Sequence, residues 1–139
     1  LKPDRYNQTT AVDMAILMNG LYHCATNSTG ILIETFPNEI TQSECELMVD
    51  QLKHNKLPYL ITAGLPDFVE IAHKHGWIEE SDGLLRTMSN IAIVYSPDAD
   101  YILSIFTYHP TNLIFENGSR LFAMISSAVY NYYNPSLVR

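Results

Sequence analysis

The chain has 139 residues, of which 47% are hydrophobic and 17% are charged, a composition that fits one globular domain and excludes an intrinsically disordered protein. Its formal net charge of −7 and the lack of a basic cluster exclude a nucleic-acid-binding surface. No apolar run is long enough to span a membrane, and no secretory signal sequence is present at Leu1. Because the chain opens on leucine rather than methionine, we expect a trimmed or processed form.

Two helices are predicted in the first half of the chain, and the first begins at a capping box formed by Thr10 and Asp13. An apolar stripe follows at three- and four-residue spacing, which is typical of a buried helix face. The residues of that stripe are Met14, Leu17, Met18 and Leu21. Residues 23–39 break the pattern and predict a loop, in which residues 30–33 form a short extended piece.

The second helix is predicted to begin after Thr41, which forms a capping box with Glu44, and to end before Pro58. Its expected inner face comprises Cys45, Met48 and Leu52. Cys24 and Cys45 fall in different predicted elements. They form a disulfide if the protein is extracytoplasmic or remain two buried thiols, and the pattern slightly favours the thiols.

An antiparallel sheet is predicted in the second half, with strands at 68–78, 89–96 and 101–108, followed by a helix at 115–132. The middle strand is apolar on both faces, so both sides of the sheet need cover. The inward residues expected in the last helix are Leu121, Met124, Ile125, Ala128 and Val129. The predicted fold class is therefore α+β, an antiparallel sheet of three strands flanked by helices.

The edges of this predicted sheet lack partners. A three-stranded sheet leaves its outer strands with unpaired backbone groups. We therefore expect part of the fold to lie outside these residues. The strand at 101–108 should have a free edge, through which the chain self-associates or receives a missing lobe.

The most informative segment is Lys74-His75-Gly76, inside the first predicted strand. A lysine among mostly apolar strand neighbours has two interpretations. It is either an edge-strand charge that discourages aggregation or a cation that faces an anionic substrate. The residues alone favour the first interpretation.

Taken in order, the elements resemble the C-terminal half of class A β-lactamases and related penicillin-recognising serine hydrolases. The resemblance covers nearly the whole chain and is completed by a β-hairpin and an amphipathic terminal helix. The segments that carry it are Thr9–Ala15, Ala63–Pro66, Ala72–Trp77 and Ile91–Asp98. It implies that residues 1–139 form a single domain, the C-terminal part of a β-lactamase-like domain.

In that family a Lys-Thr-Gly or Lys-Ser-Gly triplet lies on an edge strand beside the reactive serine. The lysine attracts the substrate carboxylate, the hydroxyl donates a hydrogen bond to it, and the glycine lets substrate approach the strand. By position, the resemblance implies that Lys74 is the catalytic electrostatic residue and that His75 and Gly76 bind substrate. His75 departs from the family, because it replaces the hydroxyl residue.

The nucleophile motifs of the family are absent. No serine of the chain lies in Ser-x-x-Lys, and there is no Ser-Asp-Asn element. These residues alone cannot perform acyl transfer. Two hypotheses follow: a fragment of a serine hydrolase acting on a β-lactam or D-Ala-D-Ala-type substrate, or a non-catalytic cell-envelope binding or interaction domain derived from that scaffold.

The resemblance also implies the protein's surroundings. It implies a small-molecule or peptidoglycan-like substrate, no nucleic-acid partner, and no metal or organic cofactor. The implied location is extracytoplasmic, whether periplasmic, cell-surface or secreted.

Three weaker candidates remain. His73 and His75 lie on one side of a strand, as some metal-binding pairs do, with Glu79, Glu80 or Asp82 as a third ligand, but zinc needs three or four convergent ligands and we expect no site. Arg86 is interpreted as a surface charge rather than a carboxylate-binding residue. Trp77 and the tyrosines are interpreted as core and rim packing.

Overall fold

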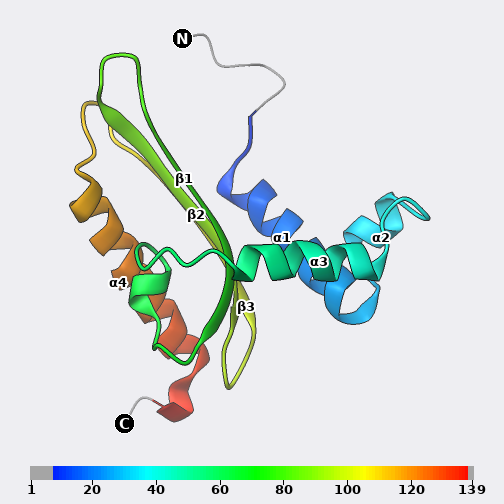
Figure 1. Cartoon of the computed structure of the whole chain (residues 1–139). Coiled ribbons are helices and arrows are strands. Elements are labelled where there is room, and N and C mark those ends of the chain that lie inside the picture. Colours follow the sequence, from blue (N-terminus) through cyan, green and yellow to red (C-terminus); the bar gives the residue numbers. More distant parts are fainter. Residues whose placement is uncertain (1–7, 138–139) are drawn as a thin grey trace.

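A computed structural model describes residues 8–137 of the chain (Figure 1). It confirms the α+β class, with three antiparallel strands in the order β1-β2-β3. The helices are α1 (Ala11–Asn27), α2 (Ile31–Thr35), α3 (Gln42–Lys53) and α4 (Phe115–Tyr133), and two 3₁₀ turns, η1 (Thr62–Gly64) and η2 (Pro135–Leu137), complete them. The strands are β1 (Glu70–Glu79), β2 (Leu85–Tyr95) and β3 (Tyr101–Tyr108).

The sheet stands between two helical layers (Figure 1). Helices α1 and α3 cover one face, and α4 with η1 covers the other. Strand β2 is buried on both faces, as its sequence predicts: Ile91 and Ile93 pack toward α1 and α3, whereas Ala92 and Val94 pack toward α4. None of the helices within residues 8–137 is long and apolar enough to cross a membrane.

Both predicted capping boxes are confirmed. The Thr10 hydroxyl accepts the Asp13 backbone N–H over 3.1 Å, and the Thr41 hydroxyl accepts that of Glu44 over 3.4 Å. In turn, the carboxylates of Asp13 and Glu44 accept hydrogen bonds from the backbone N–H groups of Thr10 and Thr41. Each box satisfies helix N–H groups that have no partner within the helix, and so fixes where α1 and α3 begin.

The segment between these helices differs from the sequence-based expectation. Helix α1 runs to Asn27, and the piece expected to be extended is the short helix α2. The Glu34 N–H donates to the Gly30 carbonyl over 3.0 Å, which closes a helical turn. Gly30 has a φ of 89°, a backbone conformation that glycine adopts without strain and that redirects the chain into α2.

The expectation of two free thiols is wrong, because Cys24 and Cys45 form a disulfide. The bond joins α1 to α3, with the two Cα atoms 5.9 Å apart, and both cysteines are fully buried. Its sequence separation of 21 residues corresponds to a loop-closure stabilisation of about 3 kcal/mol. The disulfide therefore holds together the helical layer that covers one face of the sheet.

The inward faces of the helices differ in part from the predicted stripes. Met18 and Leu21 are buried, but Leu17 and Met48 are exposed. In α4, Leu121, Met124 and Ala128 face solvent, and Met124 keeps 65% of its surface exposed. The residues that α4 buries instead are Gly118, Ser119, Phe122, Ser126 and Tyr130. Small side chains on this face let η1 approach closely, since a Cβ on Gly64 would lie 2.1 Å from the Ala123 carbonyl oxygen.

The strand register positions the Lys74-His75-Gly76 segment. In β1, Lys74 lies opposite Ile91 of β2, and His75 lies opposite Asn90. Because side chains alternate along a strand, Lys74 and Gly76 share the face covered by α1 and α3. His75 lies on the α4 face, where Asn90 is its cross-strand neighbour.

Candidate functional site

Lys74 lies on an edge strand, as predicted. The outer edge of β1 has no strand partner within residues 8–137. The Lys74 side chain is exposed, and its ammonium Nζ donates to the carbonyl oxygen of His75 over 3.0 Å. In the part of the chain that the structure describes, this ammonium has no carboxylate partner. Its charge is therefore available to an anionic group that approaches the strand.

Gly76 allows a close approach to the neighbouring strand. The Ser89 hydroxyl donates to the Gly76 carbonyl over 3.2 Å, and a Cβ on Gly76 would lie 3.1 Å from the Ser89 oxygen. That spacing is tighter than an ordinary van der Waals contact. A side chain at position 76 would therefore crowd β2 as well as any ligand on this face.

His75 is half-buried within a set of hydrogen bonds on the α4 face of the sheet. The Asn55 amide nitrogen lies 3.0 Å from Nδ1 of His75 and also donates to the His73 carbonyl over 3.3 Å. The Asn90 amide nitrogen lies 3.3 Å from Nδ1 of His73 and donates to the Lys74 carbonyl over 3.0 Å. The two asparagines therefore hold the two successive backbone carbonyls of His73 and Lys74 in β1.

Burial keeps both histidines neutral. The pKa of His73 is lowered first by desolvation, and further by the charge that His75 gains when it is protonated and by the charge of Lys56. Its hydrogen bonds to Asn55 and Asn90 oppose the shift without reversing it. The pKa of His75 is lowered by desolvation and then by the Lys74 charge. At neutral pH the cationic group of this segment is Lys74.

A row of aromatic rings extends from His75 to the start of α4. His75 stacks on Trp77 with ring centroids 4.8 Å apart, and Trp77 meets Phe115 edge-to-face at 5.0 Å. Tyr59 also meets Phe115 edge-to-face, with ring centroids 6.1 Å apart. Trp77 keeps 39% of its surface exposed, so the row packs at the rim of the core, in agreement with the sequence interpretation.

The histidine pair is not arranged as a metal site. The two rings share one face, as expected, with centroids 6.2 Å apart. His73 is fully buried, however, and each of its ring nitrogens already has a protein partner: Asn55 at Nε2 and Asn90 at Nδ1. Residues 8–137 contain no cluster of three potential ligand side chains.

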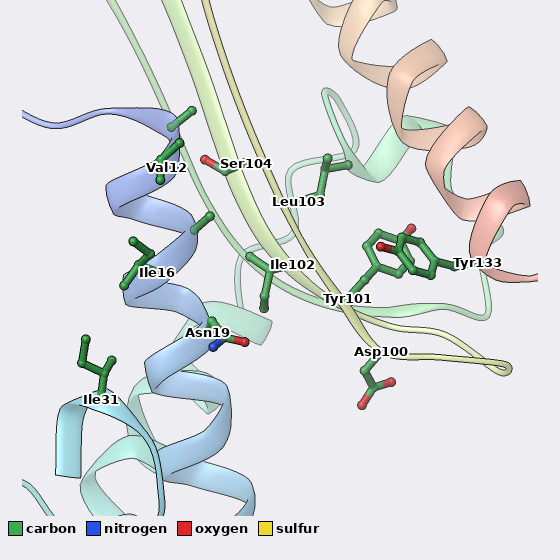
Figure 2. Close-up of a pocket in the computed structure, with 12 residues that line it drawn as sticks. Val12, Ile16, Asn19, Ile31, Asp100, Tyr101, Ile102, Leu103, Ser104 and Tyr133 are labelled. Carbon is green, nitrogen blue, oxygen red and sulfur yellow. The ribbon is translucent and has the colours of Figure 1, made fainter. Parts of the chain in front are cut away.

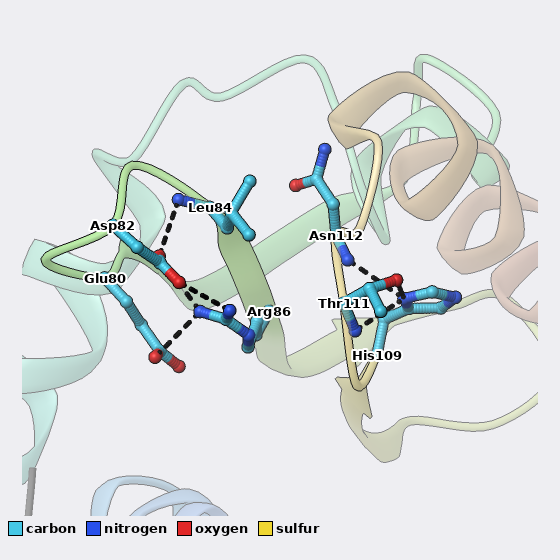
Figure 3. A network of polar contacts seen from close by, with 7 residues as sticks. All are labelled: Glu80, Asp82, Leu84, Arg86, His109, Thr111 and Asn112. Atoms are coloured by element: carbon cyan, nitrogen blue, oxygen red, sulfur yellow. Dashed lines mark hydrogen bonds and ion pairs between the residues drawn. The ribbon is translucent and has the colours of Figure 1, made fainter.

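Arg86, which precedes the strand predicted at 89–96, lies inside β2, and its guanidinium is bound by carboxylates of the β1–β2 hairpin (Figure 3). Its guanidinium forms a bidentate pair with Asp82, at 3.0 and 2.6 Å, and contacts Glu80 at 2.9 Å. The Arg86 hydrogen bonds lower the pKa of the Asp82 carboxyl. This arrangement agrees with the interpretation of Arg86 as a surface charge, and in it the guanidinium is not free to bind a carboxylate ligand.

His109 follows β3 and donates its backbone N–H to the Arg86 carbonyl over 2.9 Å. Its ring nitrogen Nδ1 accepts hydrogen bonds from the backbone N–H groups of Thr111 and Asn112.

The opposite edge of the sheet borders a groove (Figure 2). As predicted, β3 has a free edge within the described part of the chain. The groove has a volume of about 790 Å³ and runs between α1 and this edge. Its apolar lining includes the exposed side chains of Val12 and Ile16, and the Ser104 hydroxyl is buried without a partner in the described residues. This edge presents unpaired backbone groups beside an uncovered apolar surface.

Asn55 and Asn90 are the residues of this region that the sequence analysis did not identify. Asn90 carried a signal, because a polar side chain interrupts the otherwise apolar run of β2 and is fully buried there. Asn55 carried none, since it follows α3 in a segment where polar residues are ordinary. Its role depends on a contact with β1 across 20 residues of sequence.

Comparisons with known proteins agree on the fold. A family model described as the β-lactamase enzyme family matches residues 2–133. Among solved structures, the chain is similar to a mutant of PBP-A in acyl-enzyme complex with penicillin G, at 21% identity and a TM-score of 0.69. It is also similar to the TLA-3 extended-spectrum β-lactamase, at 18% identity and a TM-score of 0.71. An ancestral class A β-lactamase is similar at 18% identity and a TM-score of 0.66.

These matches include nearly all of this chain but under half of each relative. The PBP-A match covers 96% of this chain and 44% of the PBP-A chain. The matches to the TLA-3 enzyme and to the ancestral enzyme each cover 95% of this chain and 44% of the relative. No curated protein sequence matches. The chain therefore spans less than half the length of the solved proteins it resembles.

Proposed function

Because the chain belongs to the β-lactamase enzyme family, we propose that its β1 strand forms one wall of an acyl-transfer site for a β-lactam or D-Ala-D-Ala-type substrate. The observation that carries this proposal is Lys74, an exposed cation without a carboxylate partner in the described residues, on the free edge of β1. Lys74 is the electrostatic residue, and His75 and Gly76 contact the substrate.

In the proposed reaction a serine oxygen attacks the amide carbonyl carbon of the substrate. The serine hydroxyl gives up its proton, the carbon–nitrogen bond breaks, and the leaving nitrogen takes a proton in its place. An acyl ester remains on the serine until water hydrolyses it to the free acid and restores the hydroxyl. Lys74 contributes its fixed charge, which attracts the substrate carboxylate and stabilises negative charge that develops beside the strand. Gly76 keeps the strand surface low enough for the substrate backbone to approach.

The serine comes from outside residues 1–139 under this proposal, since no Ser-x-x-Lys lies within them. The groove beside β3 is where we place the junction with that other segment. An extended segment there would pair with the free backbone of β3 and cover Val12 and Ile16. The 44% coverage of the solved relatives supports this occupant over a second copy of the chain.

A second candidate function is a non-catalytic cell-envelope binding or interaction domain. Two observations favour it: the nucleophile motif is missing from these residues, and His75 stands in the place of a hydroxyl residue. Such a domain would bind the same carboxylate-bearing ligands through Lys74 without cleaving them.

An extracytoplasmic location is part of the proposal. The disulfide between Cys24 and Cys45 supports it, because structural disulfides persist mainly in oxidising compartments. Neither candidate function calls for a metal or an organic cofactor.

The experiment is to incubate the polypeptide, as its gene encodes it, with a fluorescent penicillin and to analyse it by denaturing electrophoresis and intact-mass spectrometry. The enzyme proposal predicts a covalent adduct on a serine outside residues 1–139. Saturable binding that is lost on denaturation would contradict the enzyme and support the binding domain. No binding of either kind would contradict both.

A further inference from the structure

We propose that Asn55 is a positioning residue that fixes the proton of His75 on Nε2, so that His75 presents to the substrate's carboxylate a single N–H donor of set direction. This inference rests on the function proposed above and deepens it. The family's hydroxyl can rotate, whereas the arrangement around His75 holds a donor in one direction. Backbone groups set the amide orientations of the two asparagines, Asn55 and Asn90.

The orientation of Asn90 is fixed from both ends. Its Oδ1 accepts the backbone N–H of Ile61 over 3.2 Å, and its Nδ2 donates to the Lys74 carbonyl over 3.0 Å. A flipped amide would set an NH₂ group against an N–H and an oxygen against a carbonyl, which would lose both bonds. The second hydrogen of Nδ2 therefore points to His73, and Nδ1 of His73 must accept it.

The proton of His73 consequently lies on Nε2. That nitrogen is 3.1 Å from the carbonyl oxygen of Asn55, to which it donates. His73 is fully buried and thus anchors the backbone of Asn55 against β1.

The amide of Asn55 is held in the same way, and it contacts β1 at His75, two residues beyond His73. Its Oδ1 accepts the backbone N–H of Leu57 over 3.3 Å, and its Nδ2 donates to the His73 carbonyl over 3.3 Å. These two bonds exclude the flipped amide. The remaining hydrogen of Nδ2 points to Nδ1 of His75 over 3.0 Å, so Nδ1 is the acceptor and the proton of a neutral His75 is on Nε2.

The Nε2 donor of His75 is available to a ligand. It has no hydrogen-bond partner among the described residues, and it is not one of the buried polar atoms that lack a partner. Stacking on Trp77 holds the plane of the ring, at 22° to the indole. A neutral N–H of fixed direction donates but cannot accept, so it selects an acceptor such as a carboxylate over an ammonium group, which can only donate.

His75 and Lys74 can act on the same group. They are adjacent residues on an edge strand, with side chains on opposite faces of the sheet. A carboxylate docked against the free edge of β1 would receive the Lys74 charge from one face and the His75 donor from the other.

The first test is the tautomer itself, read from imidazole ¹⁵N chemical shifts of the isotope-labelled protein above neutral pH. Wild type should show both histidines protonated on Nε2. Asn55→Asp replaces the donor with an acceptor, so it should move the His75 proton to Nδ1 and leave His73 unchanged. Asn131→Asp, an exposed asparagine on α4, is the charge-matched control. An Nδ1-protonated His75 in wild type would overturn the inference, whatever the protein's activity.

The second test uses the whole encoded polypeptide with fluorescent penicillin and with the methyl ester of the same penicillin. Asn55→Asp should weaken binding of the free acid by about tenfold or more, the effect of one hydrogen bond to a charged group, and should barely affect the ester. In a His75→Thr background, which restores the hydroxyl, Asn55→Asp should no longer matter.

The outcomes separate the two proposals. Asn55→Asp could weaken penicillin binding by the same factor in wild type and in the His75→Thr variant. That result would overturn the positioning role of Asn55 and leave the proposed function standing. If wild type binds no penicillin at all, the proposed function fails and the carboxylate assignment fails with it, even where the tautomers are as expected.

Discussion

The side-chain amide of Asn90 in β2 donates a hydrogen bond of 3.0 Å to the carbonyl of Lys74 in β1. This bond joins the strand that carries the proposed catalytic lysine to the fully buried centre of the sheet. The same side chain also bonds Ile61 and His73, so one residue of β2 holds both β1 and the segment at Ile61 beside the candidate site.

Asn90→Leu should destabilise the protein by about 2–4 kcal/mol, because it leaves the Ile61 N–H and Nδ1 of the buried His73 without partners. Urea unfolding followed by circular dichroism measures this difference. Asn131→Leu on the exposed face of α4 should change stability by less than about 0.5 kcal/mol. Equal effects of the two substitutions would contradict the assigned role of Asn90.

Stability should fall in mild acid because of His73. Its folded pKa lies below the unfolded value of 6.5, so below about pH 6.5 the unfolded chain takes up a proton that the folded protein does not. The stabilisation is complete above pH 6.5 and is lost as the pH falls toward the folded pKa. The pKa of His75 is also lowered, so its titration adds to the loss of stability in acid. The charges of Lys56 and of protonated His75 lower the pKa of His73 further.

The measurement is the free energy of unfolding at several pH values above and below 6.5. The variant His73→Gln keeps a polar group without a titration in this range, so its profile should be flatter than that of wild type. Parallel profiles would show that His73 does not cause the loss.

Reduction of the disulfide should lower stability by about 3 kcal/mol, since α1 and α3 lose their covalent connection. Chemical unfolding with and without dithiothreitol measures the change. A double variant, Cys24→Ala with Cys45→Ala, should resemble the reduced protein and be insensitive to the reductant. Sensitivity of that variant would contradict the assignment.

Gly64→Ala should destabilise the protein by about 1–3 kcal/mol, because its Cβ would lie 2.1 Å from the carbonyl oxygen of Ala123 in α4. Gly83→Asn is the matched control. That position has a φ of 75° and open space around it, and asparagine tolerates this backbone conformation. Thermal melting compares the two. An undisturbed Gly64→Ala would mean that η1 is not packed against α4 as closely as described.

Local signals in the sequence were sufficient for the main elements. The Thr10 and Thr41 capping boxes involve side chains three residues apart, and the apolar run of β2 requires cover on both faces whatever the rest of the fold. The family resemblance placed Lys74 on an edge strand, and the sheet order agrees.

Features that depend on distant partners were not predictable in the same way. Spacing alone cannot distinguish a disulfide from two buried thiols, because the sulfurs of Cys24 and Cys45 meet only when α1 and α3 pack together. In α4 the predicted stripe included Met124, yet the helix buries Ser126, since close packing of Gly64 on α4 favours small residues there. The Asn55–His75 contact likewise needs the tertiary fold.

The most direct measurement of the proposed function is the rate at which fluorescent penicillin labels the whole encoded polypeptide, compared between wild type and Lys74→Ala. Arg120→Ala, which removes an exposed cation from α4, is the control for net charge. We predict that Lys74→Ala slows labelling by about 100-fold, as loss of a group that stabilises developing charge does, and that Arg120→Ala leaves the rate unchanged. Equal labelling of wild type and Lys74→Ala would contradict the role given to Lys74.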